Sequence, residues 1–97
     1  MYQYKLDEGV SMCIGSDRYP GTVIGITKSG KTVTVQEDDA HLENQDGLGV
    51  FGNQRYRIER NEKGIVRVFR YHRSKDGFYA DGMRLNASRS AYFDPHF

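Results

Sequence analysis

The strongest constraint on the fold of this chain is an alternating run of β-branched residues on both sides of a short turn. Residues 22–27 read Thr-Val-Ile-Gly-Ile-Thr, and residues 32–36 read Thr-Val-Thr-Val-Gln. β-Branched side chains favour extended backbone, and a Ser-Gly pair such as Ser29-Gly30 is typical of a tight hairpin loop. The segment therefore predicts a β-hairpin.

A loop made of these two residues sets the register of the hairpin. Ile26 then faces Val33 and Ile24 faces Val35, so that the four large aliphatic side chains share one side. Gly25 has no side chain in the middle of the first strand, which indicates a bulge, a bend or the close approach of another backbone.

A second hairpin is predicted from residues 54–60 and 65–71, which flank turn residues 61–64. Pairing Ile58 with Val68 places Tyr56, Ile58, Val66 and Val68 on the core face. The opposite face then carries Arg55, Arg57, Arg67, Phe69 and Tyr71. Shorter strands are expected at 9–14, 78–80 and 83–85, each next to turn residues.

Five or six short antiparallel strands in 97 residues indicate an all-β fold, a small barrel or roll. We expect one domain spanning 1–97, with an acidic loop at about 37–49. The oligomeric state does not follow from the pattern. The predicted core comprises Val10, Met12, Ile24, Ile26, Val33, Val35, Tyr56, Ile58, Val66 and Val68.

Catalytic and metal-binding signatures are weak in this sequence. Residues 25–32 match the letters of a phosphate-binding loop, but the β-branched run that follows resists the helix which that loop needs. The three histidines are far apart, and the only cysteine, Cys13, lies in an apolar strand pattern. We therefore expect a binding module without catalytic residues, metal or cofactor.

The single cysteine and the lack of a signal peptide or a membrane-length apolar run predict a cytoplasmic protein without membrane contact. Charge is distributed unevenly along the chain. Residues 1–50 carry four Lys or Arg against eight Asp or Glu, whereas residues 51–97 carry ten against five. The fold can either mix these charges or present them as separate acidic and basic regions.

The best functional signal is the interleaving of arginine with aromatic residues in the basic half. Arginine supplies bidentate contacts to phosphate, and aromatic rings on a sheet stack with unpaired bases. The alternative is an ordinary solvated sheet face with Arg–Glu pairs. The pattern predicts nucleic acid as the partner, bound by Arg55, Arg57, Arg67, Phe69, Arg70, Tyr71 and Arg73.

Residues 9–23, followed by the Lys-Ser-Gly-Lys hairpin, resemble the opening of a Src-homology-3-like barrel of the Tudor or ribosomal KOW type. The whole chain also resembles short uncharacterised proteins of phages and other mobile elements. That resemblance rests on Ser16-Asp17-Arg18, Val33-Thr34-Val35-Gln36, Asp46-Gly47, Gln54-Arg55-Tyr56 and the end, Tyr92-Phe93-Asp94-Pro95-His96-Phe97.

The second resemblance implies an accessory role in mobile-element biology and gives rise to an alternative partner. A small protein of this kind could bind a host protein, for instance to inhibit a defence system. An acidic interface that mimics nucleic-acid charge would suit that role. The residues predicted for it are Glu37, Asp38, Asp39 and Glu43.

Overall fold

The computed structural model describes residues 1–42 and 56–92, and every regular element in this part of the chain is a strand. The prediction of an all-β fold is confirmed. No helix in the two described ranges is long and apolar enough to cross a membrane. The strands are β1 (Gly9–Ile14), β2 (Asp17–Ile26), β3 (Thr32–Glu37), β4 (Asp39–Leu42), β5 (Tyr56–Glu59), β6 (Val66–His72), β7 (Gly77–Ala80) and β8 (Met83–Asn86).

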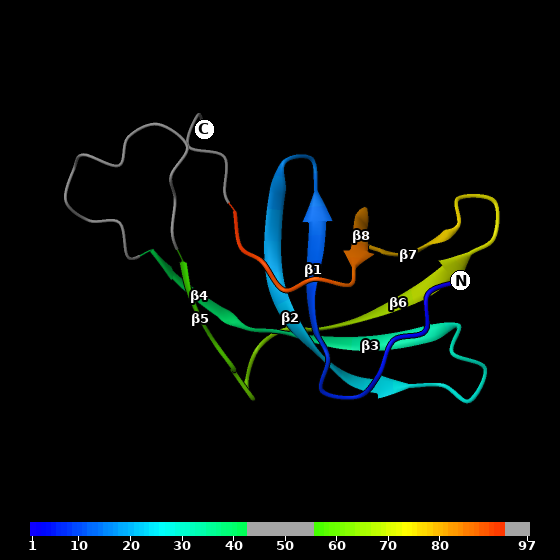
Figure 1. Cartoon of the computed structure of the whole chain (residues 1–97), viewed down its shortest axis with the longest axis horizontal. Helices are drawn as coiled ribbons and strands as arrows, with labels where there is room; N and C mark the ends of the chain where they lie inside the picture. The colour runs from blue at the N-terminus through cyan, green and yellow to red at the C-terminus, as the bar shows by residue number, and fades with distance from the viewer. Residues whose placement is uncertain (43–55, 93–97) are drawn as a thin grey trace.

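Six strands form a closed barrel in the order β1-β2-β3-β6-β7-β8, and β8 pairs with β1 to complete it (Figure 1). All these pairings are antiparallel, which is consistent with the expected Src-homology-3-like barrel. β4 and β5 form a separate two-stranded sheet, which extends to the left of the barrel in Figure 1.

The first predicted hairpin is present as β2 and β3. Ile26 faces Val33 as expected, and Gly30 occupies the turn with a positive φ of 76°, a conformation that glycine adopts without steric cost. A strand follows the turn, so the match to a phosphate-binding loop lacks the helix that would hold a phosphate.

A β-bulge at Ile24 changes the predicted register beyond this point. The pairing shifts between Val23 and Gly25, and Val35 therefore faces Val23 rather than Ile24. The bulge expected near Gly25 is confirmed, whereas the assignment of Ile24 to the core is wrong. Its side chain is 39% exposed, because one extra residue turns the following side chains to the opposite face.

The second predicted hairpin is wrong in its pairing. β5 pairs with β4, while β6 lies between β3 and β7. The turn between β5 and β6 packs against the end of β3, where buried Gln36 donates from its side-chain amide to the carbonyls of Glu62 and Gly64. The segment 39–42, predicted as loop, is strand β4; residues 43–49 lie outside the described part.

This pairing reverses the predicted faces of β6. Phe69 lies opposite Val33 and is fully buried, whereas Val66 and Val68 are 50% and 38% exposed. The placement of Phe69 on the outer face, and of the two valines in the core, is therefore wrong. Tyr56 and Ile58 are half-buried in the β4–β5 sheet rather than in the barrel core.

The barrel core is confirmed for four predicted residues, Val10, Met12, Val33 and Val35, and Ile26 packs partly against it. The other core residues come from the N-terminal segment, from the bulged strand and from the last three barrel strands. They are Tyr4, Val23, Phe69, Phe78, Met83 and Leu85.

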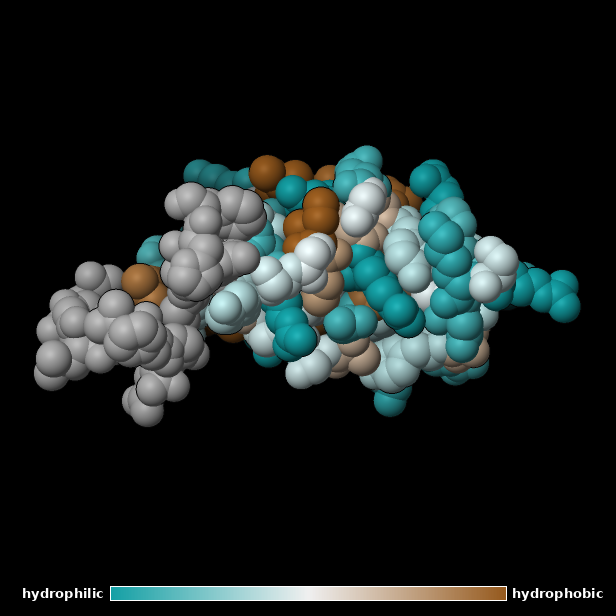
Figure 2. Space-filling view, turned by 90° about the horizontal axis from the view of Figure 1, so that it is seen from above, coloured by the Kyte–Doolittle hydropathy of each residue, from teal (hydrophilic) through white to brown (hydrophobic). Residues whose placement is uncertain are grey.

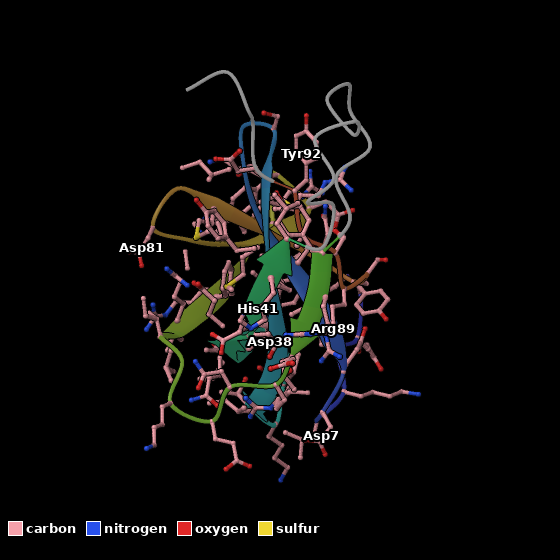
Figure 3. The ribbon with its side chains drawn as sticks, turned by 90° about the vertical axis from the view of Figure 1, so that its left-hand side faces the viewer. Asp7, Asp38, His41, Asp81, Arg89 and Tyr92 are labelled. Atoms are coloured by element: carbon pink, nitrogen blue, oxygen red, sulfur yellow. The ribbon has the colours of Figure 1, made fainter. Side chains whose placement is uncertain are left out.

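The segment after β8 is held against β1 and β2 by polar contacts. Asp38, whose side chain is fully buried, accepts a hydrogen bond from Thr22 at 2.9 Å and lies 3.1 Å from Nε of Arg89. Figure 3 shows Arg89 beside Asp38. Further along, the backbone of Tyr92 exchanges two hydrogen bonds with Arg18. The contacts of Thr22 and Arg89 offset the free-energy cost of burying the Asp38 carboxylate.

Candidate functional site

The outer face of β6, β7 and β8 carries a row of basic and aromatic side chains. Side chains alternate along each strand, so the buried Phe69 and the buried Met83 and Leu85 place Arg70 and Arg84 outside the barrel. Arg70 pairs with Tyr79, and Tyr79 pairs with Arg84. Cross-strand neighbours thus bring these residues together although they span fifteen positions of sequence.

Tyr79 is the centre of this row, because three cationic or titratable side chains contact its ring. The Lys75 ammonium lies 4.9 Å from the ring centroid and the Arg84 guanidinium 5.9 Å from it. The His72 ring meets it edge-on at 5.4 Å. We define the Tyr79 surface as Arg70, His72, Arg73, Lys75, Tyr79 and Arg84.

The Tyr79 surface is accessible and carries more positive than negative charge. Its five members other than Tyr79 are exposed, and Tyr79 is half-buried. Two carboxylates lie in the adjoining turns, Asp76 and Asp81, both exposed. The end of the molecule that carries the β6–β7 turn, at the right in Figure 1, is largely hydrophilic in the view from above (Figure 2).

Of the described residues that were predicted for nucleic-acid binding, Arg70 and Arg73 belong to this surface. Arg67 is half-buried and pairs with Glu37 at 2.7 Å, which holds β6 to β3. Arg57 lies on the separate sheet, 2.9 Å from Glu59. Arg55 is outside the described residues.

The two aromatic residues predicted for the site point inward rather than outward. Phe69 belongs to the core, and the Tyr71 ring packs against Phe78 at 5.4 Å between centroids. The Tyr71 hydroxyl donates to Asp76 at 2.6 Å. This hydrogen bond raises the pKa of Tyr71 and lowers the pKa of Asp76, so that Asp76 is a carboxylate at neutral pH.

Two of the acidic residues predicted for the alternative protein interface, Glu37 and Asp38, make contacts within the fold. Glu37 pairs with Arg67, and Asp38 is buried. Asp39 is exposed and accepts a hydrogen bond from the side chain of Asn61. Glu43 lies outside the described residues. Among the described members of this set, Asp39 is therefore the one exposed carboxylate.

Metal ligation and thiol chemistry add no second candidate among the described residues. Residues 1–42 and 56–92 contain no cluster of three or more His, Cys, Asp or Glu side chains that could hold a metal ion. Cys13 is half-buried, and burial raises the pKa of its thiol, which stays protonated at neutral pH.

The site predicted from the sequence omitted four members of the Tyr79 surface: His72, Lys75, Tyr79 and Arg84. The signal for two of them was present, because Phe78-Tyr79-Ala80 and Met83-Arg84-Leu85 each place a polar residue between two apolar ones. Joining them to Arg70 requires the order of the strands, which the pattern does not supply. Comparison of the chain with family models, curated proteins and solved structures found no match.

Proposed function

We propose that this protein binds single-stranded nucleic acid through the Tyr79 surface. The observation that carries the proposal is the Tyr79 ring between Arg70 and Arg84 in one cross-strand row, with Lys75 over the ring. Proteins that bind single strands combine backbone-tracking positive charge with aromatic rings on which bases stack. Both components lie here on the outer face of one sheet.

The chemistry of binding follows from the roles of these side chains. Arg70 and Arg73 present guanidinium groups that can contact phosphate oxygens in bidentate fashion. A base that stacks on Tyr79 replaces the Lys75 ammonium on the ring, and the lysine then reaches a phosphate. The cation–π contact that is lost contributes only about 0.5–1 kcal/mol at an exposed site.

Single strands suit this surface better than a duplex does. Reading a duplex in the major groove needs an element that fits the groove, whereas stacking on a ring at a sheet face needs unpaired bases. The described strands of the Tyr79 surface belong to a closed barrel and not to a protruding ribbon. The sequence resemblance to proteins of phages and mobile elements implies an accessory role for such binding. That this protein comes from a phage or mobile element stays a prediction.

Two variants separate the charged and stacking contributions. The double variant Arg70→Gln/Arg73→Gln removes two phosphate contacts, so the log–log slope of affinity against salt should fall by about 0.7 per contact. Tyr79→Ala should weaken binding by about 1–3 kcal/mol per stacked base with an unchanged slope. Fluorescence anisotropy with a labelled single strand measures both quantities.

Arg57→Gln is the matched control for charge, because Arg57 is an exposed arginine on β5, outside the Tyr79 surface. We expect it to leave both affinity and salt slope unchanged. If Arg57→Gln weakens binding as much as the double variant does, the protein binds through diffuse positive charge and the Tyr79 surface is not the interface.

A further inference from the structure

A cleft of about 180 Å³ opens beside the Tyr79 surface, between the N-terminal segment and the β6–β7 turn. Aromatic rings form much of its wall: Tyr2, Tyr4, Tyr71 and Phe78. Tyr2 meets Tyr4 at 4.5 Å between centroids, and Tyr4 meets Phe78 at 5.2 Å. The size and the aromatic walls suit one small planar group rather than a drug-sized ligand.

Among the described residues, the cleft presents one carboxylate and one guanidinium group, and the side chain of the carboxylate residue, Asp76, is 76% exposed. Asp76 lies in the β6–β7 turn, where its carboxylate accepts the hydrogen bond from Tyr71 and lies 3.9 Å from the N-terminal ammonium. Arg84 also lines the cleft. A methyl group at Gly77 would stand 3.2 Å from Nε of Arg84, so the glycine lets the arginine side chain lie close to the turn.

Arg84 joins the cleft to the proposed interface, because it lines the cleft and also contacts the Tyr79 ring. A nucleotide whose phosphate is bound on the Tyr79 surface can therefore place a base in the neighbouring cleft. The presence of Arg84 also disfavours a cationic ligand, although aromatic walls with one carboxylate would otherwise suit an ammonium group.

The hydrogen-bonding groups distinguish between bases. A carboxylate accepts two parallel hydrogen bonds from adjacent donors, and guanine alone among the four common bases presents such a pair, N1–H and the N2 amino group. The neighbouring O6 of guanine is an acceptor, which suits an arginine donor. Adenine, cytosine and uracil present one donor position beside acceptors, which a carboxylate repels.

We infer that the cleft between Tyr2 and the β6–β7 turn binds a guanine base of the nucleic acid, with Asp76 accepting from its N1–H and N2 groups and Arg84 donating to O6. This inference rests on the proposed function, since the bound strand supplies the base. It assigns sequence preference to the cleft, whereas the Tyr79 surface supplies affinity that does not depend on sequence.

Uncharged nucleosides test the cleft separately from phosphate binding. Titration of the protein with guanosine, followed by the amide NMR signals of Asp76 and Gly77, should shift these signals. Adenosine, cytidine and uridine should need roughly tenfold higher concentrations or more. Asp76→Asn should abolish the preference for guanosine while single-strand binding keeps its salt slope.

Asp81→Asn is a matched control, because Asp81 also occupies a turn with positive φ, 51° against 46° at Asp76. Asparagine tolerates this conformation, so neither change strains the backbone. We expect Asp81→Asn to leave guanosine binding unchanged.

The outcomes separate the two proposals. If single-stranded nucleic acid binds but guanosine does not shift the NMR signals of the cleft, or all four nucleosides shift them equally, the guanine site is overturned. The Tyr79 surface then remains the proposed interface. Absence of strand binding at low salt overturns the proposed function, whatever the nucleosides do. A cleft that responds to tetramethylammonium but not to guanosine binds cations, and this result also overturns the inference.

Discussion

At the scale of single residues, close packing around the end of β3 determines how the chain leaves the barrel and returns to it. A β-carbon at Gly64 would overlap the carbonyl oxygen of Glu37 and would make a tight contact of 3.2 Å with the carbonyl oxygen of Asn61. The Glu37 amide donates to the carbonyl of Ile65 at 2.8 Å. The turn before β6 is therefore tied to β3, and β6 starts in register with it.

Gly64→Ala should destabilise the fold by about 1–3 kcal/mol, because backbone rather than a flexible side chain must move to make room. Gly25→Ala is the control, since a methyl group there would be 3.5 Å from the Thr34 β-carbon, an ordinary contact. Urea unfolding of both variants gives the free energies of unfolding. Equal stabilities would show that the turn does not pack closely on β3.

At the scale of elements, the β-bulge in β2 and the turn before β6 decide which faces of two strands meet the core. The bulge adds one residue to β2, and the turn tied to β3 sets which face of the regularly alternating β6 meets the core. Because side chains alternate with a period of two, such an event exchanges buried and exposed positions along the strand. Val23 and Phe69 are buried for this reason.

The bulged register is tested by two neighbouring substitutions. Val23→Ala should cost about 2 kcal/mol, because it leaves a cavity in the core. Ile24→Ala should cost less than about 1 kcal/mol, because its side chain is exposed. Thermal or urea unfolding measures the difference. A larger loss of stability from Ile24→Ala than from Val23→Ala would support the hairpin register without a bulge, in which Ile24 faces Val35.

These two events also explain how far the sequence predicts the fold. Alternation and turn residues predicted the all-β class, the β2–β3 hairpin, β1, β7 and β8, because those signals are local. The pairing of β6 with β3 depends on contacts of Gln36 and Gly64 that no local pattern contains. Because the predicted pairing of β6 was wrong, the predicted binding site included the buried Phe69 and omitted Tyr79.

At the scale of the whole molecule, segments at both ends of the described chain pack on the barrel. Tyr4 brings its ring into the core and donates its hydroxyl hydrogen bond to the carbonyl of Leu85 at 3.3 Å. The segment after β8 lies against β2, where Arg89 donates to the Thr22 hydroxyl and Tyr92 forms a β-bridge with Arg18. The stability of the barrel thus depends on contacts far apart in sequence.

Burial raises the pKa of Tyr4 from 10.0 to about 12, with a smaller contribution from the charge of Glu8. The folded state therefore favours the neutral phenol. The pKa shift of Tyr4 contributes up to about 2 kcal/mol to the free energy of unfolding. This contribution is complete below about pH 10 and is lost between about pH 10 and 12. Urea unfolding at about pH 9 and about pH 11 should show a smaller pH-dependent loss for Tyr4→Phe than for the parent chain. Equal losses would place the Tyr4 hydroxyl in water.

Equilibrium binding to nucleic acid across a salt series is the most direct test of the Tyr79 surface as an interface. Fluorescence anisotropy with labelled single-stranded DNA, RNA and duplex DNA should show tighter binding to single strands. Affinity should fall linearly on log–log axes with salt, by about 0.7 per phosphate contacted. Absence of binding at low salt, or tighter binding to the duplex, would contradict a single-strand interface on β6, β7 and β8.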